Sequence, residues 1–97
     1  MNATKATQPE KAQRFQALHA RPGVFVIPNP WDIGSARMLE SLGYEALATT
    51  SAGYAFSTGR LDGAVGLDEM IEHCRILCAA TSLPVSADLE NGYADDP

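Results

Sequence analysis

The sequence predicts an α/β protein with a parallel sheet, and it favours the N-terminal part of a (β/α)8 barrel. Short apolar segments alternate along the chain with amphipathic helical segments, which is the order of β-α-β units. Parallel strands need such crossover connections, because a tight hairpin cannot join them. The last apolar segment also carries acidic residues on one face, and a barrel has a place for them at its active-site end.

Composition narrows the class of protein. The 97 residues are 45% hydrophobic and 20% charged, which indicates one globular unit or part of one. The formal net charge of −5 argues against nucleic acid or an anionic membrane as the main partner. No apolar run approaches the roughly 18 residues that a membrane span needs, and the N-terminus lacks the apolar core of a secretory signal. We therefore expect a cytoplasmic protein.

The first predicted helix covers residues 7–20. Thr7 and Glu10 have the spacing of a capping box, and Pro9 lies in the expected first turn. Residues 24–27 follow as a compact apolar run bounded by Pro-Gly on one side and proline on the other, which predicts a short buried strand. The chain thus begins with a helix that precedes the first strand.

The order of strand and helix then repeats. Residues 31–43 combine an apolar stripe at helical spacing with Gly43 at the position that usually ends a helix. Residues 44–51 are predicted to form a second strand, and residues 66–81, with acids in their first turn, a second helix of the repeat. Residues 83–90 are predicted to form the third strand.

Residues 51–65 form a polar, glycine-containing segment that is longer than a connection requires. Long loops after strands often carry function. We expect this loop to settle over a site at the strand ends.

The two cysteines and two histidines could bind a metal by residue type, but structural positions are expected for all four. Cys74 and Cys78 lie four apart in a helical pattern without a second pair to complete a zinc site, so we expect small core residues. His19 and His73 also fall in helical segments, where surface or helix-end positions are expected.

The third strand favours the barrel over a doubly wound sheet. The segment "NPWDIGSAR" after the first strand has a single glycine, so the dinucleotide-binding fingerprint is absent. Two sets of residues alternate along the third strand, namely Val85, Ala87 and Leu89 on one face and Ser86, Asp88 and Glu90 on the other. An open sheet would bury the polar face under helices at a high cost. In a barrel, Asp88 and Glu90 would point inward at the active-site end, where they suit Mg²⁺, although a solvated strand end has the same spacing.

The residues also carry a family resemblance. The segments "NPWDIGSARMLESLGYEALATTSAGYAFSTGRLDG" and "LPVSADLENGY" resemble the N-terminal part of the isocitrate lyase/phosphoenolpyruvate mutase superfamily. The resembling motifs are an N-x-W-D-x-x-S-A-R helix start, a T-T-S strand end, a G-x-x-D loop and an acidic strand end followed by Gly-Tyr. Together they are specific, and they cover most of the chain.

The resemblance implies a Mg²⁺ site and a reaction. Members bind Mg²⁺ and an α-keto or α-hydroxy carboxylate at the barrel mouth, and they make or break C–C or P–C bonds through an enolate-type intermediate. By this resemblance Asp88 would ligate the metal directly. Glu90, which stands where Asp is commoner, would act through metal-bound water, and Asp62 would hold the metal's water shell as a catalytic residue.

The same resemblance implies that Thr50, Ser51 and Ala52 hold the substrate carboxylate and the enolate oxygen. Members have eight strands, so residues 1–97, with three, are expected to be an incomplete N-terminal portion of one barrel domain, inactive alone. Neither Cys74 nor Cys78 matches the general-acid Cys of the lyases, which lies on a loop in the later part of the barrel, because both fall in the second helix of the repeat. The full-length protein is expected to be a homo-oligomer.

Two choices stay open at this stage. The chain length is also that of an ordinary domain, so a stand-alone α/β module that binds a small acid or a partner without catalysis is the alternative. Within the enzyme class, a C–C lyase, a P–C mutase or hydrolase and an oxaloacetate decarboxylase are not distinguished.

Overall fold

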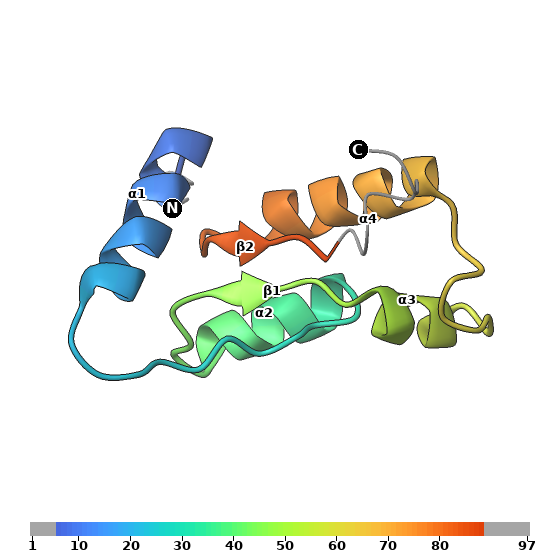
Figure 1. The fold of residues 1–97 in the computed structure, drawn as a ribbon, viewed down its shortest axis with the longest axis horizontal. Helices are drawn as coiled ribbons and strands as arrows, with labels where there is room; N and C mark the ends of the chain where they lie inside the picture. Colours follow the sequence, from blue (N-terminus) through green and yellow to red (C-terminus); the bar gives the residue numbers. More distant parts are fainter. Residues whose placement is uncertain (1–5, 89–97) are drawn as a thin grey trace.

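The computed structural model describes residues 6–88, which contain four α-helices and a two-stranded parallel sheet (Figure 1). In chain order the elements are α1 (Gln8–Ala20), α2 (Ile33–Ser41), β1 (Leu47–Ala48), α3 (Ser51–Ser57), α4 (Leu67–Ala80) and β2 (Val85–Ser86). The strands pair with Leu47 opposite Val85 and Ala48 opposite Ser86. The α3 and α4 helices lie between the two strands in sequence, as a parallel crossover requires.

Local capping interactions fix where the first two helices begin. In α1 the Thr7 hydroxyl accepts a hydrogen bond from Glu10 N at 3.3 Å, and the Glu10 carboxylate accepts one from Thr7 N at 3.1 Å. The predicted capping box is therefore confirmed. A second box starts α2, where Asp32 Oδ1 accepts from Ser35 N at 2.8 Å. After α2 the chain reverses through Gly43, whose φ of 95° is a left-handed conformation that glycine adopts without strain.

Two small apolar clusters hold these elements together. The fully buried Ala36, Leu47 and Leu77 join α2, β1 and α4 into the larger cluster. The second cluster consists of Ala55, Val65 and Met70, with Tyr54 packed against it. It attaches α3 to the first turn of α4, so it supports the region after β1 where the candidate site lies.

The strand predicted over residues 24–27 is not a strand in the structure. This segment is extended and lies beside β1, where Ala48 N donates a hydrogen bond to Pro28 O at 3.0 Å. Pro28 and Pro30, which follow the segment, have no N–H to donate, so a regular ladder cannot continue through residues 28–30. Val24 and Val26 are 98% and 66% exposed, contrary to the predicted burial.

The prediction that residues 51–65 form a loop was wrong over its first half, which is α3. Thr50 caps this helix by accepting a hydrogen bond from Gly53 N at 3.2 Å. Gly53 lies within the helix, whereas Gly59 and Gly63, with φ values of 77° and 88°, shape the loop that follows. The true loop is residues 58–66, between α3 and α4.

The cysteine and histidine predictions were met in part. Cys74 and Cys78 are free thiols on α4, and both are half-buried. His19 is exposed in the last turn of α1, as predicted. The prediction for His73 was wrong, because this residue is buried against the Tyr54 ring. None of the helices in residues 6–88 has both the length and the apolar character to cross a membrane.

Candidate active site

The carboxyl ends of the two strands open on the same edge of the sheet, because the strands are parallel. Thr49, Thr50 and Ser51 follow β1, and Ala87 and Asp88 follow β2. In barrels of β-α units, this edge is where active sites are built. The predicted site residues of the described part therefore gather at one end of the molecule, near the start of α3 (Figure 1).

Ser51 connects two of the predicted acidic residues. Its backbone N–H donates a hydrogen bond to Asp88 Oδ2 at 3.1 Å. Its hydroxyl donates to Asp62 Oδ1 at 3.0 Å. Ser51 is buried, and it brings the strand-end acid and the loop acid to opposite sides of one residue. These three residues, Ser51, Asp62 and Asp88, are called the acid–serine site below.

The hydroxyl of Thr49 fixes the backbone of Asp88. Asp88 N donates to the Thr49 hydroxyl at 2.6 Å, and Thr49 N donates to Ser86 O at 2.8 Å. Thr49 is 2% exposed, and its hydroxyl also lies 3.9 Å from the thiol of Cys74. Burial raises the pKa of this thiol above its usual value, so Cys74 stays a neutral neighbour of the site. Thr49 was not predicted as a site residue, although it lies two positions before Ser51 and so on the same face of an extended chain.

Asn29 is a second residue that the sequence analysis missed. Its side-chain amide donates to Ala48 O at 3.1 Å and to Thr49 O at 3.4 Å. These bonds tie the end of the extended segment to the end of β1. The available signal was that Asn29 directly follows the first apolar segment and opens the N-x-W-D motif.

The other predicted site residues differ in what they contact. The Thr50 hydroxyl is engaged as the cap of α3, and Ala52 is half-buried in the first turn of that helix. Of the predicted apolar face of the third strand, Val85 packs against the larger apolar cluster, while Ala87 is exposed. Leu89 and Glu90 lie outside the described residues.

The chemistry of the acid–serine site is that of hard oxygen ligands. Two carboxylates and a hydroxyl suit Mg²⁺, which commonly takes one or two carboxylates and completes its shell with water and substrate oxygens. Residues 6–88 contain no group of three or more His, Cys, Asp and Glu side chains placed around one point. The described residues thus supply two carboxylates and a hydroxyl of this kind but no complete metal site, and Mg²⁺ binding is taken up below as a proposal.

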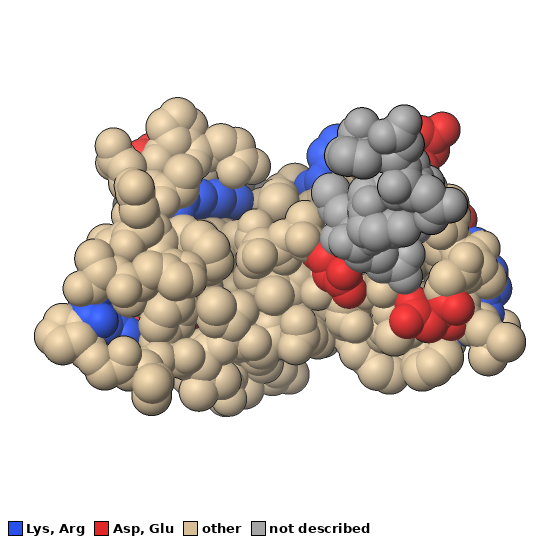
Figure 2. All heavy atoms as spheres, viewed as in Figure 1, with Lys and Arg blue, Asp and Glu red and all other residues tan. Residues whose placement is uncertain are grey.

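Acidic side chains also lie on the molecular surface around this end. In Figure 2 most of the red side chains visible on that face are in its right-hand half. Figure 1, drawn from the same direction, has α3 and the beginning of α4 in that half. Blue Lys and Arg side chains are visible in the same half, so the charges on this face are mixed in sign.

The fold and the site together define a class: α/β proteins with a parallel sheet and a cluster of oxygen-bearing side chains near the carboxyl ends of its strands. The comparison with known families is more specific. The sequence profile of the family described as phosphoenolpyruvate phosphomutase matches residues 15–97, and the chain belongs to this family. The resemblance seen in the sequence is thereby confirmed.

Known proteins support the same assignment. The chain is 30% identical over 90 residues to 2-methylisocitrate lyase of Bacillus subtilis, a match that covers 92% of this chain and 30% of that protein. A crystal structure of a candidate lyase/mutase from Burkholderia cenocepacia has 62% identity and a TM-score of 0.88, over 90% of this chain and 31% of that one. The structure of 2,3-dimethylmalate lyase, a member of the phosphoenolpyruvate mutase/isocitrate lyase superfamily, has 35% sequence identity and a TM-score of 0.75. This match covers 86% of the present chain and 30% of that one.

These matches confirm the predicted fold class, because the related structures are barrel proteins of this superfamily. The chain spans about a third of the length of the relatives that it matches. The activity of a whole protein that carries this chain is therefore taken up as a proposal.

Proposed function

We propose that this chain forms the N-terminal part of the barrel domain of a Mg²⁺-dependent lyase or mutase that acts on a small α-keto or α-hydroxy carboxylate. The observation that carries the proposal is the acid–serine site, where Ser51 contacts both Asp62 and Asp88 at the carboxyl ends of parallel strands. The names of the relatives support the substrate class, because methylisocitrate, dimethylmalate and phosphoenolpyruvate are all small carboxylates.

In this proposal Asp88 ligates the metal, and Asp62 and Glu90 hold the water around it. When bound, Mg²⁺ supplies polarisation of a substrate carbonyl and stabilises negative charge on its oxygen. The protein's part is to keep the Asp88 carboxylate in place beforehand. Thr49 accepts from the backbone N–H of Asp88, and Ser51 donates to its side chain, so this acid is held from two sides.

The substrate carboxylate would lie over the segment formed by Thr50, Ser51 and Ala52. The Ser51 hydroxyl is the polar side-chain group of this segment that faces the acids, since the Thr50 hydroxyl already caps α3. This hydroxyl has one proton, which it donates to Asp62 here, so a substrate oxygen would accept that hydrogen bond in place of Asp62 when it binds. We assign binding of the substrate to Ser51 first, with Thr50 shaping the helix start that presents it.

The later strands of the barrel would complete the site with residues that this chain does not contain. We propose that the whole protein is a homo-oligomer located in the cytoplasm, with a small carboxylate as its ligand. Whether a C–C or a P–C bond reacts would depend on those later residues.

The test uses a full-length protein that carries this chain, assayed with 2-methylisocitrate, 2,3-dimethylmalate and phosphoenolpyruvate. Turnover of at least one of them should disappear with EDTA and return with added Mg²⁺. Asp88→Ala should abolish this turnover, whereas Asp68→Ala, which removes an exposed acid in the first turn of α4, should leave it unchanged. Activity of Asp88→Ala within about tenfold of the parent, roughly 1.4 kcal/mol of transition-state stabilisation, would contradict the proposal.

A further inference from the structure

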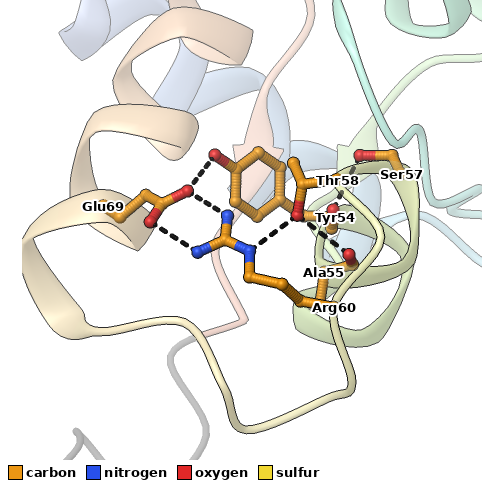
Figure 3. Close-up of polar contacts among 6 residues, drawn as sticks. All are labelled: Tyr54, Ala55, Ser57, Thr58, Arg60 and Glu69. Carbon is orange, nitrogen blue, oxygen red and sulfur yellow. Dashed lines mark hydrogen bonds and ion pairs between the residues drawn. The ribbon is translucent and has the colours of Figure 1, made fainter.

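Three polar side chains on α3, the following loop and α4 form one connected group, the Tyr54–Arg60–Glu69 cluster (Figure 3). The Arg60 guanidinium makes a bidentate ion pair with Glu69, with Nη1 2.9 Å from Oε1 and Nη2 on Oε2. The Tyr54 hydroxyl donates to the same Oε2 at 2.6 Å. The guanidinium carbon also lies 5.9 Å from the centre of the Tyr54 ring. Each member therefore contacts the other two.

The cluster anchors one side of the loop that carries Asp62. Arg60 N donates to Ala55 O at 2.8 Å, and its Nε donates to the Thr58 hydroxyl at 2.8 Å, so both its backbone and its side chain are fixed. Figure 3 shows the Arg60 side chain extending from the loop to Glu69 on α4. Two residues later in the sequence comes Asp62.

The other side of the loop is anchored by apolar contacts. Val65 is 5% exposed and packs with Ala55 and Met70. Between the two anchors the chain makes a tight turn, with Ala64 N donating to Leu61 O at 3.1 Å and Gly63 at a φ of 88°. Asp62 is the residue before that glycine, so it lies in a short turn that is fixed on one side by Arg60 and on the other by Val65.

This arrangement differs from the mobile cover that the sequence suggested. A loop that closes over a site usually has few fixed contacts, whereas this loop is attached on both sides of Asp62. The Glu69 carboxylate stays ionised over the physiological range, because Arg60 first and Tyr54 second lower its pKa to about 2. Both partners of the ion pair are thus charged at neutral pH.

We propose that the Tyr54–Arg60–Glu69 cluster is a positioning device for the reaction, which holds Asp62 against the Ser51 hydroxyl before substrate binds. Glu69 and Arg60 act through Asp62 and do not themselves touch the substrate. The inference rests on the proposed function, in which Asp62 organises the metal's water shell. It adds two positioning residues to that site and removes the need for a closing movement of the loop.

The experiment is a double-mutant cycle in the full-length protein, with kcat/KM measured at saturating Mg²⁺. Glu69→Gln keeps the shape of the side chain but removes the charge that binds Arg60. It should lower kcat/KM by about tenfold when Asp62 is present, and by less than about twofold in the Asp62→Asn background, because coupled residues are not additive. Arg60→Lys, which retains the charge but loses the bidentate geometry, should show the same dependence on Asp62.

Glu72→Gln is the matched control. Glu72 pairs with Arg75 on the same helix, but that pair is more exposed, and its ion pair joins two residues of α4 rather than α4 and the loop. Its kcat/KM should equal that of the parent in both backgrounds.

The outcomes separate the inference from the proposed function. An equal loss of kcat/KM for Glu69→Gln with Asp62 present and in the Asp62→Asn background would mean a general structural role and would overturn the inference. The inference would also be overturned if Glu69→Gln had no effect on kcat/KM while Asp62→Asn had a strong one. An Asp62→Asn protein with unchanged kinetics would remove Asp62 from the site, and this inference would fall with it.

Discussion

Replacing Gly53 by alanine tests whether the packing of α3 sets the position of Ser51. A methyl group at Gly53 would overlap Nε1 and Cδ1 of the Trp31 ring and would lie 2.6 Å from Cγ2 of Thr50. Carbon atoms in contact prefer separations of about 3.5–4.0 Å, so something must move by roughly 1 Å. Either the half-exposed Trp31 ring swings outward or α3 shifts, and Ser51 is the first residue of α3.

Overpacking of this kind costs about 1–3 kcal/mol of stability. We expect urea unfolding of full-length Gly53→Ala to show a loss in this range and kcat/KM to fall by at least about tenfold, the usual size of a misplaced contact of about 1.4 kcal/mol. Gly34→Ala is the matched control, because the new methyl would have only an ordinary contact of 3.7 Å with Asp32 Oδ1. The free energy of unfolding of that variant should rise by up to about 1 kcal/mol, since alanine is favoured over glycine in a helix. Equal stability and kinetics in Gly53→Ala and the parent would refute the packing argument.

Three further variants test other parts of the structure. Lys11 is buried and donates to two backbone carbonyls at the end of α4, at 2.6 and 2.9 Å. Lys11→Met should therefore lower the free energy of unfolding, measured in urea, by about 3 kcal/mol. A loss no greater than that of Arg14→Met, which changes an exposed side chain bonded to one carbonyl, would contradict this. Thr49→Val removes the hydroxyl that accepts from Asp88 N, so its Mg²⁺ affinity should be about tenfold weaker than that of the parent. Thr49→Ser retains the hydroxyl and should bind Mg²⁺ as the parent does. Equal Mg²⁺ affinity in Thr49→Val and Thr49→Ser would exclude the role of the hydroxyl. The folded-state pKa of Glu69, about 2, is below its usual 4.5, so its stabilising contribution is complete above about pH 4.5 and is lost as pH falls towards 2. The stability difference between the parent and Glu69→Gln should therefore shrink from about pH 6 to about pH 3.5, and a constant difference would contradict the ion pair's role.

The features predicted best from the sequence are those encoded locally. The capping box of Thr7 and Glu10 and the reversal at Gly43 depend on residues a few positions apart, and both are present. The predicted strand over residues 24–27 is wrong, although its apolar pattern is strand-like, because Val24 and Val26 are exposed rather than packed against the sheet.

The missed α3 has a different cause. Gly53 looked like a loop residue, but its lack of a side chain serves the close approach of Trp31, which is a tertiary contact. No local pattern reports such a contact.

The candidate site shows the same division. The family resemblance predicted roles for Ser51, Asp62 and Asp88, and the structure brings these three together. Thr49 is part of the T-T-S motif but received no role, and nothing indicated the pairing of Arg60 with Glu69, because both residues act through contacts between elements that meet only in the fold. The assigned roles in metal and substrate binding remain predictions.

The central claim is that Asp88 anchors a divalent metal ion at the acid–serine site. Isothermal titration of the full-length protein with Mg²⁺ tests it most directly, comparing the parent with Asp88→Asn and with the exposed-acid control Asp68→Asn. The account predicts that Asp88→Asn binds Mg²⁺ at least about tenfold more weakly, roughly 1.4 kcal/mol, while Asp68→Asn matches the parent. Equal Mg²⁺ affinity in the parent and Asp88→Asn would contradict it.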